Sequence, residues 1–232
     1  MSIKDGRDYL LLVWKEPKTR RCYTIGELSK NGQFEFSYGY EVGKAIEAGF
    51  ELLIAFPDIE KVYKNEKLFS VFSSRLPDPK RKGIDAILEK YGLSEYDHYN
   101  LLKKSGAKLP IDNLEFFDPI FDFESEEIVR SFFVAGPRHY LGCEGKECEK
   151  SFDVKIEEKL FLIPEPENKY DKYAVKITNS KDEKLGYLPR YYAQGISCLI
   201  SQGRKISCRV IEVNKDNVCN DCIKVELKIT RN

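Results

Sequence analysis

An aromatic ring and a carboxylate stand next to each other in this chain at Tyr170 and Asp171. They belong to residues 165–171, a polar, turn-rich segment between two strand-like runs, which predicts an exposed loop. An exposed ring can stack on a nucleic-acid base, and a carboxylate accepts hydrogen bonds from hydroxyls but repels phosphate. The pair therefore fits the sugar end of a strand, and Arg138 could supply the compensating phosphate contact.

The same residues also fit a purely structural role. Asn168 and Asp171 are ordinary turn formers. The ring of Tyr170 would then cover the end of a barrel, and Arg138 would form a surface ion pair. The later residues 186–189 are explained by a turn and a helix start alone.

Cysteines form a second candidate site. Two pairs, each bracketing a polar loop beside a predicted strand, are Cys143 with Cys148 and Cys219 with Cys222. Four thiolates from two loops would hold a structural zinc ion if the loops meet in space, and the alternative is four unrelated thiols. The remaining cysteines fall within apolar patterns and are expected to be small buried hydrophobic residues: Cys22, Cys198 and Cys208.

Catalytic motifs have little support. With only two histidines, His98 and His139, a paired-histidine metalloprotease helix and most histidine-dependent triads are excluded. Residues 39–44 resemble a phosphate-binding loop, but the glycine spacing is too short and Ala45 replaces the hydroxyl residue that would bind Mg²⁺. The sequence also holds no nucleophile elbow and no kinase catalytic loop. We therefore expect a protein that is not an enzyme.

The amino-acid composition excludes several further classes of protein. A hydrophobic share of 42% and a mean hydropathy of -0.46 are typical of a soluble globular protein rather than a disordered or fibrous one. No apolar run approaches the roughly 18 residues of a membrane span, and residues 1–6 hold no signal-peptide pattern, so we expect a cytoplasmic location. Seven cysteines in a reducing compartment make a disulfide framework unexpected.

Charge is distributed unevenly along the chain. Residues 1–127 hold 19 basic and 23 acidic side chains, whereas residues 128–232 hold 19 and 15. The net charge of zero predicts no non-specific attraction of the whole molecule to nucleic acid. Because the sign changes near the acidic segment 121–127, we place a domain boundary there, between domains 1–121 and 128–232.

The first half reads as a mixed α+β module. Alternating apolar residues predict strands over 9–14, 22–28, 33–38 and 114–117, with a hairpin turn at Asn31-Gly32. Apolar residues at helical spacing predict helices over 68–72, 84–91 and 94–105.

The second half is mainly β. Strands are predicted over 132–136, 160–163, 174–178, 184–188, 206–213 and 222–229. One helix interrupts them, with Pro189 at its first position and Gly203 as its stop. Six short strands and one helix predict a compact barrel or curled sheet of the size used by many oligonucleotide-binding modules.

Two motifs of the second half together carry a family resemblance: Asn168-Lys169-Tyr170-Asp171 leading to Ala174-Val175, and Gly186-Tyr187-Leu188-Pro189. Their combination resembles the HIRAN domain family. Family members attached to helicase-like remodelling ATPases adopt an oligonucleotide-binding-like β fold and bind single-stranded DNA with a free 3′ hydroxyl. The resemblance implies the same activity and partner here. It also implies a pocket formed by Arg138 and His139 with Tyr170 and Asp171, in which the carboxylate accepts from the 3′ hydroxyl. His139 departs from the family's usual tyrosine, and Tyr140 could compensate.

The first half has a looser resemblance. Residues 34–38, the turn at 72–77, Arg81 and the segment 101–112 are similar to the N-terminal subdomain of HipA-type toxin kinases. The kinase domain is absent, so the resemblance implies an interaction role, such as docking a HipA-like kinase or another partner, rather than phosphoryl transfer. Arg75 and Arg81 could bind that partner or phosphate, or simply pair with nearby acids.

These observations together predict an α+β protein with two modules. The first is a HipA-type α+β module, and the second is a β-barrel-like, OB-like HIRAN module with one helix. The expected function is non-catalytic recognition of single-stranded DNA 3′ ends. The alternative is a regulatory subunit of a HipA-like toxin-antitoxin or defence system, in which the second module is a scaffold.

Overall fold

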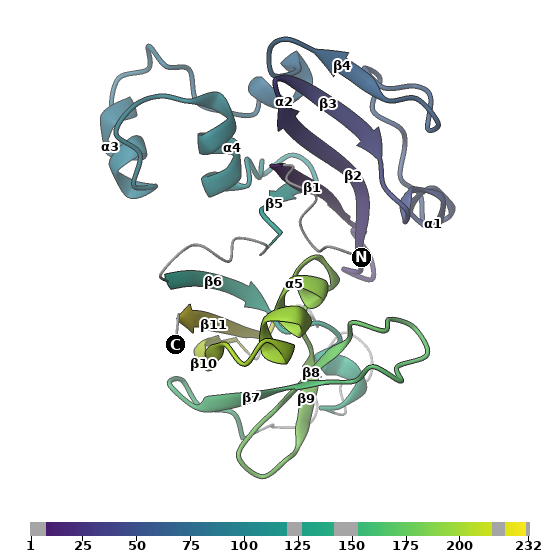
Figure 1. Cartoon of the computed structure of the whole chain (residues 1–232), viewed down its shortest axis with the longest axis vertical. Helices are drawn as coiled ribbons and strands as arrows, with labels where there is room; N and C mark the ends of the chain where they lie inside the picture. The colour runs from purple at the N-terminus through teal and green to yellow at the C-terminus, as the bar shows by residue number, and fades with distance from the viewer. Residues whose placement is uncertain (1–7, 120–126, 142–152, 215–220, 231–232) are drawn as a thin grey trace. The chain divides into compact units, whose positions relative to one another are not determined.

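The computed structural model describes residues 8–119, 127–141, 153–214 and 221–230. Contacts within the chain divide it into two compact units, Met1–Pro119 and Ile120–Asn232, and each is described by itself (Figure 1). No helix in these ranges has the length and apolar character needed to cross a membrane.

The first unit is built on a five-stranded antiparallel sheet with the strand order β4-β3-β2-β1-β5. Its strands are β1 (Tyr9–Lys15), β2 (Cys22–Asn31), β3 (Gln33–Tyr38), β4 (Tyr63–Asn65) and β5 (Leu114–Phe117). Gly32 adopts a positive φ of 79° between β2 and β3, as the Asn-Gly turn predicts. The helices are α1 (Val42–Glu47), α2 (Ser70–Ser73), α3 (Ile84–Lys90) and α4 (His98–Ser105).

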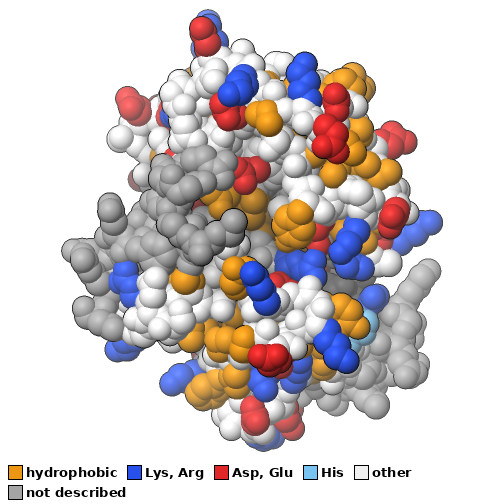
Figure 2. Space-filling view, turned by 45° about the vertical axis from the view of Figure 1, so that its right-hand side comes forward, with side chains coloured by type: hydrophobic (Ala, Val, Ile, Leu, Met, Phe, Trp, Pro, Cys, Tyr) orange, Lys and Arg blue, Asp and Glu red, His pale blue; other side chains and the backbone are white. Residues whose placement is uncertain are grey.

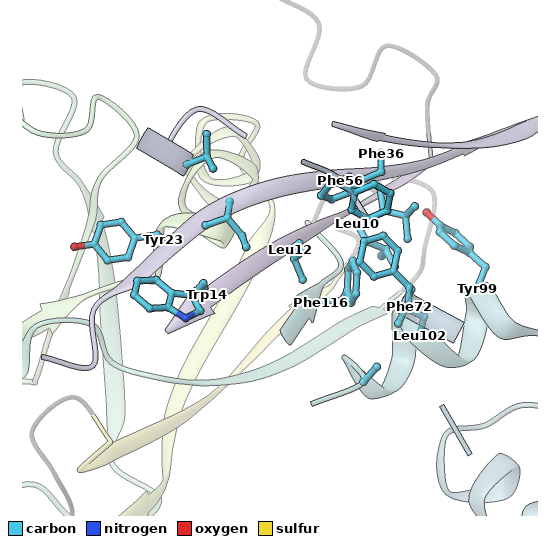
Figure 3. Close-up of a cluster of buried hydrophobic side chains, with 14 of the residues drawn as sticks. Leu10, Leu12, Trp14, Tyr23, Phe36, Phe56, Phe72, Tyr99, Leu102 and Phe116 are labelled. Atoms are coloured by element: carbon cyan, nitrogen blue, oxygen red, sulfur yellow. The ribbon is translucent and has the colours of Figure 1, made fainter. Parts of the chain in front are cut away.

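Aromatic side chains fill the core of the first unit (Figure 3). The ring of Phe36 on β3 lies 4.3 Å from that of Phe56 and 5.2 Å from that of Phe72 on α2, measured between centroids. Phe72 in turn contacts Phe116 on β5. Because these rings come from segments far apart in the sequence, their burial joins the sheet to the short helices that would not be stable alone.

The second unit contains a six-stranded antiparallel sheet with the order β6-β11-β10-β7-β8-β9. Its elements are β6 (Glu127–Phe133), the 3₁₀ turn η1 (Pro137–His139), β7 (Lys159–Pro164), β8 (Val175–Thr178), β9 (Lys184–Tyr187), α5 (Arg190–Ser201), β10 (Lys205–Val213) and β11 (Ile223–Thr230). Just beyond β6, Ala135 forms a bridge to Tyr187 of β9, so the two edge strands are linked and the sheet curls into a half-barrel. The buried face of α5 supplies Tyr192, Ala193, Ile196 and Leu199 to the core.

The predicted fold class, α+β with a curled, OB-like sheet and one α-helix in the second half, is confirmed. Three elements were not predicted, namely α1, β4 and η1, and β6 begins five residues before its predicted start. Pro189 caps α5 rather than occupying its first turn. The burial expected of Cys22 is wrong, because this residue begins the exposed end of β2, whereas Cys208 is buried and Cys198 half-buried.

Candidate nucleic-acid interface

The segment that follows β7 is a turn held by its own side chains. The side-chain oxygen Oδ1 of Asn168 accepts hydrogen bonds from the backbone N–H groups of Tyr170 and Asp171, at 3.0 and 3.3 Å. Oδ1 of Asp171 accepts from the N–H of Tyr173 at 2.9 Å. The backbone N–H of Glu165 donates to the carbonyl of Ala174 and closes the base of the loop. The turn-forming role predicted for Asn168 and Asp171 is therefore satisfied in detail.

The ring of Tyr170 projects from this turn into solvent. The residue is 88% exposed, so its ring does not cover the end of the barrel. Its backbone is nonetheless fixed, because the guanidinium of Arg190 donates to its carbonyl at 3.1 Å. A large ring presented on a fixed backbone is a suitable surface for stacking.

The carboxylate of Asp171 has a cation beside it. Its second oxygen, Oδ2, lies 3.7 Å from Nε of Arg190, the first residue of α5. Both side chains are partly exposed, so a ligand can reach the pair from solvent. The sequence interpretation named Arg138 for the phosphate contact and named no cation for Asp171; in the structure Arg190 is the cation beside this carboxylate.

The other three predicted site residues are Arg138 and His139 of η1 and Tyr140, which directly follows it. Nε of Arg138 donates to Nε2 of His139 at 3.3 Å, and the ring of Tyr140 lies edge-on to that of His139. In the described part of the chain Arg138 has no carboxylate within ion-pair distance, so the predicted surface ion pair is not formed there. Gly136 begins this turn with a positive φ of 68°.

A glycine sets how closely this turn approaches β9. A Cβ atom on Gly186 would lie 2.6 Å from the carbonyl oxygen of Ala135, closer than real Cβ contacts. Only glycine therefore permits the two hydrogen bonds between Ala135 and Tyr187, at 2.8 and 2.9 Å. Its structural role, predicted from the turn alone, also positions the segment that carries Arg138.

Tyr187 connects η1 to the loop. Its ring contacts that of Tyr140, with centroids 5.9 Å apart, and its hydroxyl donates to Oε2 of Glu165 at 2.7 Å. Nδ2 of Asn168 donates to the same hydroxyl at 3.2 Å. Contacts thus run without a break from His139 through Tyr140 and Tyr187 to the turn at Asn168.

Lys184 lies against the two tyrosines. Its Nζ is 4.6 Å from the ring centroid of Tyr140 and 4.0 Å from that of Tyr187. Burial alone would lower the pKa of Lys184, but its hydrogen bond to Tyr187 and the electrostatic effects of Tyr140, Tyr187 and Glu165 together outweigh burial and raise the pKa. Burial likewise opposes ionisation of Glu165, but hydrogen bonds from Tyr187 and Asn168, together with the positive charges of Lys184 and Lys176, outweigh burial and lower the pKa of that carboxyl. Both groups are therefore charged at neutral pH.

All five predicted residues, Arg138, His139, Tyr140, Tyr170 and Asp171, belong to these two connected segments. We define the Tyr170 surface as residues 138–140 and 165–171, together with Lys184, Tyr187 and Arg190. On the face of the second unit that Figure 2 presents, Lys and Arg side chains lie among hydrophobic ones. Sequence reasoning missed Arg190 and Lys184, although both are basic residues next to the Gly-Tyr-Leu-Pro turn.

The predicted zinc site falls largely outside the described residues. Cys143, Cys148 and Cys219 lie there, and Cys222 is buried immediately before β11. Within the described ranges, no group of three or more His, Cys, Asp or Glu side chains is placed to hold a metal ion. A structural zinc ion bound by these four cysteines stays a prediction.

Comparison with known protein families finds a matching family model for each half of the chain. Residues 130–229 match the family model of the HIRAN domain. The second unit carries a HIRAN domain. Residues 21–110 match the family model of the HipA N-terminal domain, so both resemblances seen in the sequence are confirmed.

Two solved structures resemble this chain. The HIRAN domain of human HLTF is 20% identical, with a TM-score of 0.36, and the match covers 46% of this chain and 81% of that one. A protein from Lactobacillus plantarum is 19% identical, with a TM-score of 0.35, covering 46% of this chain and 99% of that one. No curated protein matches the chain.

Proposed function

We propose that the HIRAN domain of this protein binds single-stranded DNA at its 3′ end without catalysing a reaction. The observation that carries the proposal is the exposed ring of Tyr170, held on a hydrogen-bonded turn beside the carboxylate of Asp171. The family match supports nucleic-acid binding as the general activity.

Each group has a distinct part in this proposal. Tyr170 stacks on the terminal base, and Oδ2 of Asp171 accepts a hydrogen bond from the 3′ hydroxyl. Arg190 offsets the charge of Asp171, which would otherwise repel the nearest phosphate. Arg138 binds a phosphate of the backbone, with His139 and Tyr140 beside it.

The end preference is tested with paired oligonucleotides that carry a 3′ hydroxyl or a 3′ phosphate. We expect the unmodified protein to prefer the hydroxyl form at least tenfold, since a hydrogen bond to a carboxylate contributes about 1.5–3 kcal/mol. Asp171→Asn keeps an oxygen for the N–H of Tyr173 but removes the charge, so the preference should largely disappear. Fluorescence anisotropy measures both affinities.

Asp182→Asn is the matched control, because Asp182 is an exposed acid in the turn at the other end of β8. It should leave the preference unchanged. Equal binding of the two oligonucleotides by the unmodified protein would remove the role given to Asp171.

For the first unit we propose an interaction role, with a HipA-type kinase as the partner. The family match over residues 21–110 supports it, and this range includes Ile54, an aliphatic side chain that is 99% exposed. Co-expression of the full chain with such a kinase should allow both to be purified together. Ile54→Asp should reduce capture at least fivefold, whereas Ile111→Asp, an exposed position outside the matched range, should not. Failure of the unmodified chain to retain the kinase would contradict this role.

A further inference from the structure

A groove of about 570 Å³ runs along β7 in the second unit, apart from the residues of the Tyr170 surface. One wall is residues 159–163 of β7, and the rest comes from the turn after β8, the C-terminal end of α5 and the first half of β10. Neighbouring residues of a strand point to opposite faces. A groove lined by five consecutive residues therefore follows the edge of the strand, where its backbone groups are presented.

The two strands that border the groove separate along it. β7 pairs with β10 only at Leu160–Cys208 and Lys159–Arg209. Continuing the same register would pair Leu162 with Ile206, but within the described residues the ladder ends before them. β7 is still paired with β8 on its other side from Phe161 to Pro164, and β10 is still paired with β11. Each strand therefore stays extended while one of its edges has lost its strand partner.

The side chains of the groove are aliphatic rather than aromatic. Leu162, Ile163, Ile200 and Ile206 contribute to its lining. The single ring is that of Phe161, and Nζ of Lys159 lies 5.5 Å from its centroid. Stacking of successive bases needs several open rings, so this lining favours a peptide over a nucleic-acid strand.

Charge around the groove is mainly positive. Lys159 and Arg204 line it at two places, against a single acid, Asp182. A ligand with acidic side chains is therefore attracted, while the aliphatic lining requires that alternate side chains be apolar.

We propose that this groove binds an extended peptide segment of a partner protein, with alternating apolar and acidic side chains, as an added β-strand between β7 and β10. The peptide backbone continues the hydrogen-bonded β-ladder that ends at the Leu160–Cys208 pair. With a rise of about 3.3 Å per residue, the edge from Phe161 to Pro164 accommodates about four residues of such a strand.

The test uses a library of random octapeptides displayed on phage and selected against the full chain. Selection should enrich peptides in which apolar and acidic residues alternate. Phe161→Glu, which places a negative charge in the groove, should weaken the enriched peptide at least tenfold in fluorescence anisotropy. Val129→Glu is the matched control, because Val129 lies on β6 and is as exposed as Phe161, at 42% for both. N-methylation of alternate peptide amides should also abolish binding.

Thermal unfolding of each variant establishes that it is folded, and Lys159→Glu at an exposed position provides a second groove variant. Selection that yields no peptide preferring the unmodified chain over both groove variants overturns the proposal. Retained binding of the N-methylated peptide also overturns it, because no strand is then added. Two further observations would show that the groove holds another occupant, and each would overturn the proposal. The first is an oligonucleotide that shifts the NMR signals of residues 160–163, and the second is a dimer that Phe161→Glu dissociates.

Discussion

Replacing Tyr170 with alanine is expected to weaken binding of a short 3′-hydroxyl oligonucleotide by roughly 5- to 150-fold, because stacking of one base on an aromatic ring contributes about 1–3 kcal/mol. The ring is exposed and its removal leaves no cavity, so the unfolding temperature should not change. The turn itself stays intact, since its hydrogen bonds come from Asn168, Asp171 and backbone groups. Fluorescence anisotropy at fixed salt concentration gives the affinity.

Tyr40→Ala is the control for this experiment. Tyr40 is 75% exposed but belongs to the first unit, so its loss removes an exposed ring of the same type away from the HIRAN domain. Its removal should leave DNA affinity unchanged. If both variants bind equally well, the exposed ring of Tyr170 is not a stacking surface and the proposed site is wrong.

Tyr170 and Asp171 could be found from sequence because the chemistry and the turn signal occupy the same few residues. Asn168 fixes the turn through local hydrogen bonds, which a local pattern predicts. Arg190 could not be found in this way. It reaches Tyr170 and Asp171 only because α5 begins next to the loop in space, 19 residues after Asp171 in the chain.

The same dependence on local pattern separates the elements of the first unit that were predicted from α1 and β4, which were not. Alternation of apolar residues marks β3 and β5 at the bounds they adopt. By contrast, α1 has six residues and no side-chain cap, and β4 has three residues. α1 buries only Val42 and Ala45, which are too few periodic positions to indicate a helix, and both elements depend on tertiary packing for their stability.

Arg75 shows how a candidate functional residue can turn out to be structural. Its side chain is only 8% exposed and forms an ion pair with Asp112 through both terminal nitrogens. It also donates to the carbonyls of Ala107 and Leu114, at 3.0 and 2.9 Å. The guanidinium thereby joins the end of α2, the turn after α4 and the start of β5. A partner or a phosphate ion would have to displace these contacts to reach it.

Replacing Arg75 with methionine is therefore expected to destabilise the first unit by about 3 kcal/mol, because one partner of a buried ion pair is removed and two carbonyls lose their donor. This corresponds to a fall in the unfolding midpoint of the order of 10 °C, measured by differential scanning calorimetry of the full chain. Methionine retains much of the packing of the arginine stem, so the loss reports on the guanidinium. Arg81→Met, at an exposed position, should leave the midpoint unchanged.

The double variant Arg75→Met/Asp112→Asn separates the ion pair from the two carbonyl contacts. If the unpaired carboxylate of Asp112 causes part of the loss, neutralising it should recover about 1 kcal/mol, and the two substitutions will not be additive. Asp112 is itself partly exposed, so recovery should be incomplete, and the rest of the loss belongs to the carbonyls of Ala107 and Leu114. A single variant Arg75→Met that keeps full stability and loses only kinase capture would instead make Arg75 a partner-binding residue.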